Sequence, residues 1–392
     1  MLRQSLRGAG LAALLLLSSC ASPESDRLLV LSNLPETAFV IERYNHQTGL
    51  AVEFQYVEDL TTRLTQEEIE ADVVIGRWVN TPPVNRLMHD RTVYFEGDGI
   101  DAHLLSLSPQ WIPLSFNLPV LVFLRDDPHL DGRIAESLQT LERWYETPDP
   151  PIHFAPTVNP DTTYAVHRSL GFRPAVNPET GAPLWDSQDL RTALSTVADW
   201  QDSHNGGGAE TAAYADRYLY EPPLRQLDKG RTSVVYLPSH ELFDWQFFSR
   251  RDYEFRWLSG PTGTITAAEN IVYGGIPQAS KRQTAAGAFL TWLTEPGTQS
   301  DLAIAKNEAR IEGLGVLDGF STDPLVNRSL VADLYPEFAG RIPQPRALAF
   351  SGPLPRYWNE ARRAVVAPYL QQTDQAGLLR DALDLWYRQR GD

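Results

Sequence analysis

The chain has 392 residues, of which 42% are hydrophobic and 21% are charged, a balance typical of a folded globular protein. Its formal net charge of −16 argues against nucleic acid or an anionic lipid surface as a partner. Because one hydrophobic core rarely serves so many residues, we expect the chain to fold into two lobes.

The first twenty residues have the organisation of a secretory signal peptide. Arg3 and Arg7 precede an apolar run at 11–17 that is too short to span a bilayer, and small residues then lead to Cys20. Cys20 is the only cysteine, so it has no disulfide partner within the chain. This end resembles the lipobox of bacterial lipoproteins, which implies cleavage of residues 1–19 and lipidation of Cys20. We therefore expect a protein of the cell envelope, anchored by lipid to the outer face of a bacterial membrane and facing the periplasm or the exterior; the alternative is an ordinary signal peptide with a chance cysteine.

After the lipidated cysteine and a short polar linker at 20–27, strands and helices are expected to alternate. Apolar runs and helical spacing predict a strand, a helix, a strand, a helix and a strand at 28–33, 36–49, 51–57, 60–70 and 71–76. This order is typical of a parallel α/β sheet.

Beyond these elements, the sequence predicts one unusual strand and several further helices. Residues 112–123 are apolar on both faces and contain two prolines, which suits a strand that leaves one sheet and enters another. Helices are expected at 135–145, 190–201, 285–293, 357–366 and 376–388.

Several segments, in this order, resemble the sugar-binding family of bacterial extracellular solute-binding proteins, the receptors of ABC importers. They are the helix and strand at 44–52 with the strand at 71–75, the apolar strand at 112–123, the glycine and strand at 228–236, and the segment 274–299. The resemblance implies a periplasmic-binding-protein-like fold, in which two α/β lobes of type II are joined by crossing hinge strands. It also implies a monomer without cofactor or catalytic residues, which captures a small solute, expected to be a carbohydrate, and delivers it to the permease subunits of an ABC importer.

The expected lobes are discontinuous in sequence. The first takes residues 28–117 and 274–320, and the second takes 118–273 and 321–392. The chain is expected to cross between them near 115–120, 271–276 and 318–324, and closure about these hinges would bury the ligand.

Residues at the carboxyl ends of the expected strands are the candidate ligand contacts, because α/β sheets bind ligands at those ends. By position, the candidates are Asn33, Trp78, Asn117, Tyr236, Ser239 and Tyr273. The resemblance supports Asn33, Trp78 and Asn117, and it adds Trp358. Trp78 and Trp358 are expected to stack on the ligand, although core packing explains each of the seven residues as well.

The sequence supports catalysis and metal binding less well than ligand binding. Residues 239–241 read Ser-His-Glu, but consecutive side chains cannot converge as a catalytic triad. The loop at 126–131 groups three carboxylates with a histidine, yet it lacks the spacing of a calcium or zinc site and is better explained by turn formation, so no metal is expected. Two alternatives to an importer receptor stay open: a surface enzyme that hydrolyses polysaccharide with paired carboxylates, and a receptor fold that serves as a sensor or adhesin.

Overall fold

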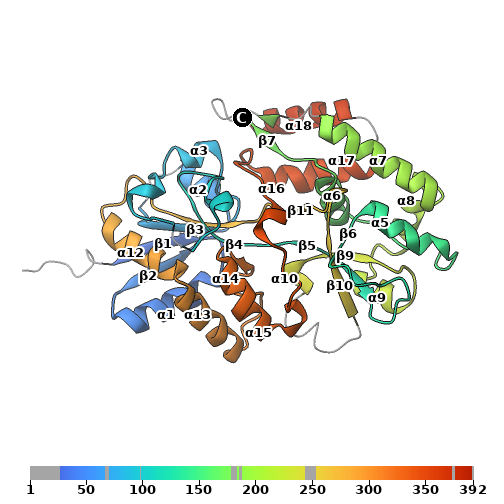
Figure 1. Ribbon diagram of the computed structural model, residues 1–392. Coiled ribbons are helices and arrows are strands. Elements are labelled where there is room, and N and C mark those ends of the chain that lie inside the picture. The colour runs from blue at the N-terminus through green and yellow to red at the C-terminus, as the bar shows by residue number, and fades with distance from the viewer. Residues whose placement is uncertain are drawn as a thin grey trace, which may run out of the picture.

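The protein consists of two bodies that lie side by side, each built on its own β-sheet (Figure 1). The computed structural model describes residues 27–66, 70–97, 99–177, 183–184, 188–242, 253–372 and 376–390. The predicted signal peptide and Cys20 lie outside these residues. We call the body on the larger sheet the first lobe and the other body the second lobe.

The first lobe contains a six-stranded sheet with the predicted parallel core. Its strands lie in the order β13 (Phe320–Ser321), β4 (Ile112–Phe116), β12 (Val272–Gly275), β3 (Val73–Gly76), β1 (Leu28–Ser32) and β2 (Val52–Tyr56). β1 pairs in parallel with β2 and β3, whereas β12 pairs antiparallel with β3 and β4. β1 and β3 consist mainly of Leu, Val and Ile and are almost wholly buried, as expected for central strands with helices on both faces.

Helices cover both faces of this sheet: in Figure 1 the helices α2 and α3 lie above it, and α1 and α13 lie below it. The helices of the first lobe are α1 (Thr37–Thr48), α2 (Leu60–Gln66), α3 (Pro82–Asn85), α4 (Ala102–Leu105), α12 (Gln283–Thr294), α13 (Pro296–Glu308), α14 (Pro324–Val326) and α15 (Ala332–Leu334), with short η2 (Arg91–Val93) and η4 (Asn327–Val331). The expected helices at 36–49, 60–70 and 285–293 are confirmed, with ends that shift by a few residues.

The second lobe contains a four-stranded sheet and the larger share of the helices. Its strands lie in the order β6 (Ala135–Glu136), β10 (Tyr253–Leu258), β5 (Pro119–Leu124) and β9 (Val235–Pro238). The helical elements are α5 (Leu138–Leu141), η3 (Glu142–Glu146), α6 (Pro160–Ser169), α7 (Gln188–His204), α8 (Gly208–Arg217), α9 (Pro223–Asp228), α10 (Ser239–Leu242), η5 (Pro336–Phe338), η6 (Pro345–Ala347), α16 (Trp358–Ala361), η7 (Arg362–Val366), α17 (Ala367–Gln372) and α18 (Ala376–Gln389). Two small pairs complete the strands: β11 (Ile265–Thr266) with β14 (Leu348–Ala349), and β7 (Ala175–Val176) with β8 (Pro183–Leu184).

One predicted helix of the second lobe is wrong in its first three residues. The segment expected to be helical from 135 to 145 begins with the strand β6, and α5 starts only after Ser137. The Ser137 and Thr140 side chains form a reciprocal capping box, which satisfies the free amide groups at the start of this short helix.

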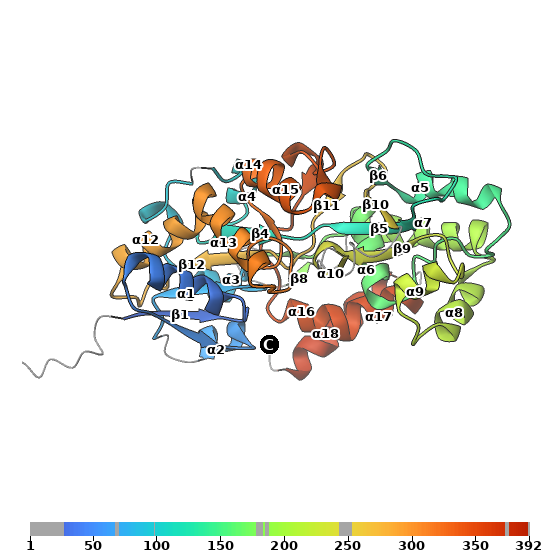
Figure 2. The same cartoon turned by 90° about the horizontal axis from the view of Figure 1, so that it is seen from below.

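The first crossing between the lobes lies where the sequence predicts it. β4 belongs to the first sheet and β5 to the second, and only Asn117 and Leu118 separate them. Figure 2 shows these two strands running from one lobe to the other.

The strands at the other two predicted crossings, β12 and β13, both belong to the first sheet. β12 spans most of 271–276 and belongs to the first sheet, so the second crossing comes earlier, at 267–271. β13 still pairs with β4, so the third crossing comes after it, and the chain reaches the second sheet at Phe338, whose ring stacks on that of Trp257 at 6.0 Å between centroids. The domain boundaries themselves stay a prediction.

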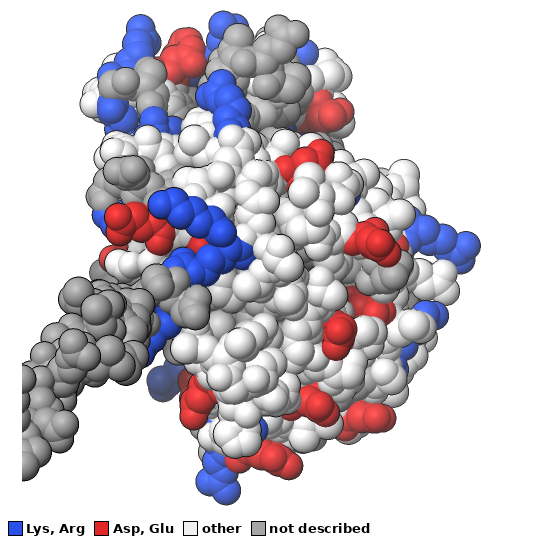
Figure 3. All heavy atoms as spheres, turned by 90° about the vertical axis from the view of Figure 1, so that its left-hand side faces the viewer, with Lys and Arg blue, Asp and Glu red and all other residues white. Residues whose placement is uncertain are grey.

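On the outer surface of the first lobe, the acidic side chains do not form a patch. Figure 3 shows Asp and Glu side chains scattered around this face, with a broad area without charged side chains between them. In the part of the chain that the structure describes, no helix is both long enough and apolar enough to cross a membrane.

Candidate functional site

A cavity of about 250 Å³ lies between the two lobes, beside the first two crossings. The first lobe, the crossings and the second lobe all contribute to its walls. The lining residues are Arg77, Trp78, Pro119, Asp161, Tyr164, Ala165, Arg168, Tyr236, Pro238, His240, Glu241, Thr266, Ala267, Ala268, Glu269, Asn270, Asn359, Arg362 and Arg363. A cavity shared by two lobes is a typical place for a small-molecule site.

Trp78 lines this cavity two residues after the end of β3, in an unusual backbone conformation. Its φ angle is +65°, a left-handed value that bulky residues rarely adopt and that often marks a ligand site. Asn33 holds this turn, because its side chain accepts a hydrogen bond from Arg77 N and donates one to Arg77 O, both at 3.0 Å. Gly76 permits the close approach, since a Cβ there would lie 2.8 Å from Asn33 Oδ1. Asn33 therefore positions Trp78 and does not line the cavity itself.

Arg362 lies between aromatic rings that come from different lobes. Its guanidinium carbon is 6.0 Å from the ring centroid of Trp78 and 5.2 Å from that of Tyr164. Asp161 binds the same guanidinium at 3.0 Å. This stack joins the first lobe, through Trp78, to α6 and η7 of the second lobe.

Asn117 and Ser239 meet at the first crossing rather than in the cavity. Ser239 Oγ donates to Asn117 Oδ1 at 2.7 Å, and Asn117 Nδ2 donates to the backbone oxygen of Asp318 at 2.9 Å. The Asp318 carboxylate binds Arg77 at 2.8 Å. Both predicted contacts are almost wholly buried, so they tie the hinge together and neither of them lines the cavity.

The wall formed by β9 and α10 of the second lobe carries Tyr236, His240 and Glu241. Tyr236 lines the cavity as predicted, and burial raises the pKa of its hydroxyl, which therefore stays protonated. Burial lowers the pKa of His240, so this imidazole is neutral at pH 7. Glu241 is exposed at the mouth, yet the cleft walls remove enough water to raise its pKa, and the carboxylates of Asp161 and Asp318 raise it further.

Trp358 and Tyr273 belong to the core, in contrast to their predicted place in the cleft. Trp358 is 1% exposed, and its ring N–H donates to Glu269 Oε2 at 2.6 Å. Tyr273 is 4% exposed, and its ring lies 6.2 Å from that of Trp111. Because neither ring has a free face in this structure, neither can stack on a ligand here.

Glu269 holds the floor of the cavity together. Its Oε2 also accepts a hydrogen bond from Tyr164 at 2.6 Å, and its Oε1 lies 3.3 Å from the guanidinium of Arg168. Glu269 and Arg168 are both about 95% buried or more. This buried pair fixes the second crossing to α6.

Several buried polar atoms of the lining have no hydrogen-bond partner among the described residues. They are Arg77 Nε, His240 Nδ1, Asn270 Oδ1 and Arg362 Nε. These atoms are themselves buried, so they lie within the wall and do not open onto the cavity.

A second opening continues the cleft outward from His240 and Glu241. It has a volume of about 510 Å³ and is lined by acidic residues and by the prolines that precede and begin α9. The acidic residues are Glu36, Glu241, Glu312 and Asp318. The cleft is therefore rich in arginine at its inner end and acidic at its outer end.

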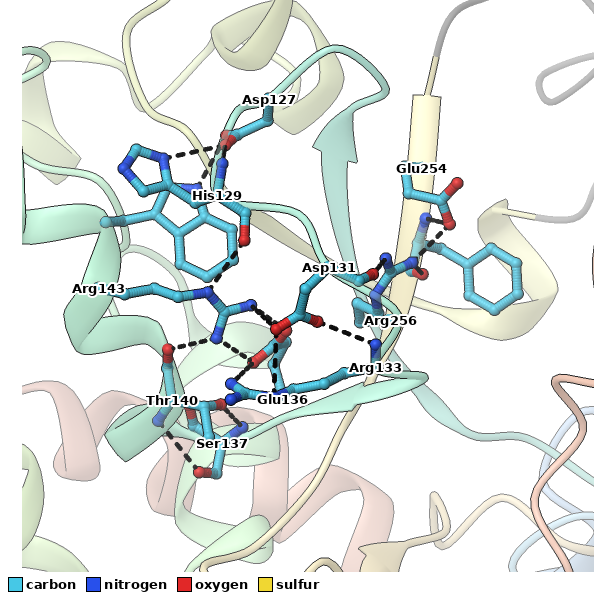
Figure 4. A network of polar contacts seen from close by, with 12 residues as sticks. Asp127, His129, Asp131, Arg133, Glu136, Ser137, Thr140, Arg143, Glu254 and Arg256 are labelled. Carbon is cyan, nitrogen blue, oxygen red and sulfur yellow. Dashed lines mark hydrogen bonds and ion pairs between the residues drawn. The ribbon is translucent and has the colours of Figure 1, made fainter.

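The acidic loop at 126–131 forms turns and ion pairs, in agreement with its interpretation as a turn (Figure 4). Asp127 Oδ1 accepts from the backbone N of His129 at 2.9 Å, and its Oδ2 accepts from the Trp144 ring at 2.8 Å. Asp131 Oδ1 likewise accepts from Arg133 N. Within the described ranges, no cluster of three or more His, Cys, Asp or Glu residues could hold a metal ion.

The sequence analysis missed most of the second-lobe wall. Asp161, Tyr164 and Arg362 come from helices, and Glu269 with Asn270 comes from a crossing predicted too late in the chain. We chose candidates at the ends of predicted strands, and this choice does not find residues that lie on helices or on a crossing.

Comparison with protein-family models and with curated proteins gave no match. Solved structures do match. An ABC substrate-binding protein from Listeria monocytogenes in complex with cycloalternan has a TM-score of 0.61 at 12% identity and covers 93% of this chain and 99% of its own. The cyclic α-maltosyl-1,6-maltose binding protein of Arthrobacter globiformis has a TM-score of 0.62 at 15% identity, and the match covers 91% of this chain and 96% of that protein. The sugar-binding protein MalE of Xanthomonas citri has a TM-score of 0.62 at 13% identity, and the match covers 93% of this chain and 98% of that protein. The predicted periplasmic-binding-protein-like fold is thereby confirmed over nearly the whole described chain.

Proposed function

We propose that this protein is the substrate-binding receptor of an ABC importer and captures a carbohydrate by closure of its two lobes. The ligand occupies the cavity that Trp78, Tyr236 and Arg362 line. It is released to permease subunits without chemical change, and the receptor acts as a monomer.

The cavity between the two lobes, lined by aromatic and polar side chains from both, carries this proposal. A sugar hydroxyl can donate and accept at once, which suits a lining that includes the polar side chains of Asn270, Asn359 and Arg363. The Trp78 ring supplies the half-apolar surface on which a sugar ring stacks. Each neighbouring structure that we name above is, by its description, a sugar-binding or substrate-binding protein.

A thermal-shift screen of the purified chain tests the proposal. Sugars, peptides, polyamines and anions are added in turn, and a specific ligand should raise the melting temperature by mass action. Small-angle scattering with the best ligand should show a smaller radius of gyration, because the lobes close on it. Chemical turnover of any saccharide would instead support the polysaccharide-acting enzyme, and stabilisation by another compound class alone would refute carbohydrate binding.

We further propose that Cys20 is acylated and anchors the protein to the outer face of a bacterial membrane. The charged, apolar and small-residue segments before Cys20 support this proposal. Expression with a labelled fatty acid should label the wild type and not the Cys20→Ala variant. Equal labelling of both, or none of the wild type, would refute the anchor.

A further inference from the structure

We propose that the segment 351–357 is a latch that holds the two lobes together from outside the cavity. This inference rests on the proposed function, because closure of the lobes is the step by which the receptor captures its saccharide. None of the residues in this segment lines the cavity, so the latch sets the affinity without touching the saccharide.

The latch is anchored in the second lobe. Leu354 is 3% exposed and packs in one cluster with Tyr164 of α6 and Leu190 of α7. The backbone oxygen of Arg356 accepts a hydrogen bond from the Tyr387 hydroxyl of α18 at 2.8 Å. Because α6, α7 and α18 all belong to the second lobe, the latch moves with that lobe.

Two hydrogen bonds join the latch to the first lobe. The backbone N of Leu354 donates to the backbone oxygen of Asn80 at 2.9 Å. The Arg356 guanidinium donates to Thr65 Oγ1 of α2 at 3.1 Å. Figure 1 shows α16, which directly follows the latch, at the boundary between the two lobes. Both bonds span this boundary, so both must break when the lobes separate there.

The first lobe holds its side of the latch in place. Asn80 is 1% exposed, and its Oδ1 accepts a hydrogen bond from Asn85 Nδ2 at 2.9 Å. Asn85 Oδ1 accepts in turn from the ring N–H of Trp111 at 2.6 Å, and Trp111 is fully buried. A buried, connected network of this kind makes its members rigid. The carbonyl that receives the Leu354 N–H is therefore fixed to the core of the first lobe.

The latch acts on the cavity through Trp78, which precedes Asn80 by two residues. Trp78 lines the cavity and packs against the second-lobe cluster that contains Leu354. Its ring is also 6.0 Å from the guanidinium carbon of Arg362. Separation of the lobes at the latch therefore takes Trp78 away from the wall that it faces. Since only the molecules in the closed arrangement bind tightly, a contact that favours this arrangement raises the affinity.

Distances between the lobes in the free protein test the latch directly. Cys20 is the only cysteine, so a Cys20→Ala chain takes spin labels only at Leu50→Cys in the first lobe and Leu219→Cys in the second, both at exposed positions. In pulsed electron paramagnetic resonance, Arg356→Met and Thr65→Val should each increase the share of separated lobes. Arg380→Met, on the exposed side of α18, is the matched control and should not. Identical distance distributions in all variants would overturn the latch, whether or not any saccharide binds.

Calorimetry with neutral trisaccharides, maltotriose and mannotriose among them, tests the effect on affinity. Arg356→Met and Thr65→Val should each weaken binding about five- to tenfold. The factor should be the same for every trisaccharide that binds, because the latch does not touch it. The double variant should bind no more weakly than the single ones, since either substitution removes the same bond. Losses that differ between trisaccharides, or that add in the double variant, would overturn the inference. If no saccharide binds to any variant, the proposed function fails, and the distances alone decide the latch.

Discussion

Ser239 Oγ donates a hydrogen bond to Asn117 Oδ1 at 2.7 Å, across the point where the chain passes from the first sheet to the second. The same hydroxyl accepts a bond from the backbone N of Leu118 at 3.0 Å. Asn117 in turn donates to the backbone oxygen of Asp318, just before β13 of the first lobe. One buried side-chain pair thus fixes the geometry of the hinge from both sides.

Removal of this hydroxyl should destabilise the fold. Ser239→Ala leaves Asn117 Oδ1 and Leu118 N buried without that partner, at a cost of about 1–3 kcal/mol. We expect a corresponding fall in the free energy of unfolding, measured by urea denaturation. Ser195→Ala, on the exposed face of α7, is the control and should change it by less than about 0.5 kcal/mol. Equal effects of the two substitutions would contradict the role assigned to Ser239.

Trp78 should contribute to ligand affinity rather than to stability. Its side chain lines the cavity and is only partly buried, so Trp78→Ala removes a stacking surface worth about 0.5–1.5 kcal/mol beyond the buried area. We expect roughly tenfold weaker saccharide binding in calorimetry. Tyr220→Ala removes a ring that is 94% exposed and outside the cavity lining, and it should leave binding unchanged. Unaltered affinity in Trp78→Ala would show that the ligand lies elsewhere.

The fold could be predicted further than the site, and the final helices show why. The alternation of strands and helices is set by local hydrophobic patterns, so most elements were placed to within a few residues. The site depends on which face of each element meets the other lobe. In α16 and η7, Trp358 and Ala361 face the core while Asn359, Arg362 and Arg363 face the cavity, in keeping with a helical period.

The prediction that Trp358 lines the cleft was therefore wrong, although Trp358 lies on a helix whose other residues line the cleft. Asn117 and Ser239 lie at the first crossing and bond each other, a pairing that the sequence does not show. Trp78 and Tyr236 were predicted correctly as lining residues, since each lies at or next to a strand end. Ligand contact by any of the seven candidates stays a prediction.

Glu269 should be essential to the second crossing. Glu269→Gln keeps the shape of the side chain but leaves the charge of Arg168 buried without its counter-ion, which costs about 3–5 kcal/mol. The free energy of unfolding should fall by this amount in urea denaturation. Glu308→Gln, at the exposed end of α13, is the control and should stay close to wild type. A small effect at Glu269 would mean that Arg168 finds other partners.

Acid should weaken the fold through His167, which lies in α6 behind the cavity. This residue is fully buried, its Nδ1 donates to Thr163 O at 2.7 Å, and burial lowers its pKa from 6.5 to about 4. The unfolded chain therefore binds a proton below pH 6.5 that the folded chain binds only near pH 4, so stability falls as the pH falls through this window. From pH 7 to pH 5 the loss should be about 2 kcal/mol, at 1.36 kcal/mol for each unit of pH below 6.5. His167→Gln should lose this share of the pH dependence of the unfolding free energy, whereas the exposed His46→Gln should keep it. Identical pH profiles of His167→Gln and wild type would show that His167 is not held neutral by burial.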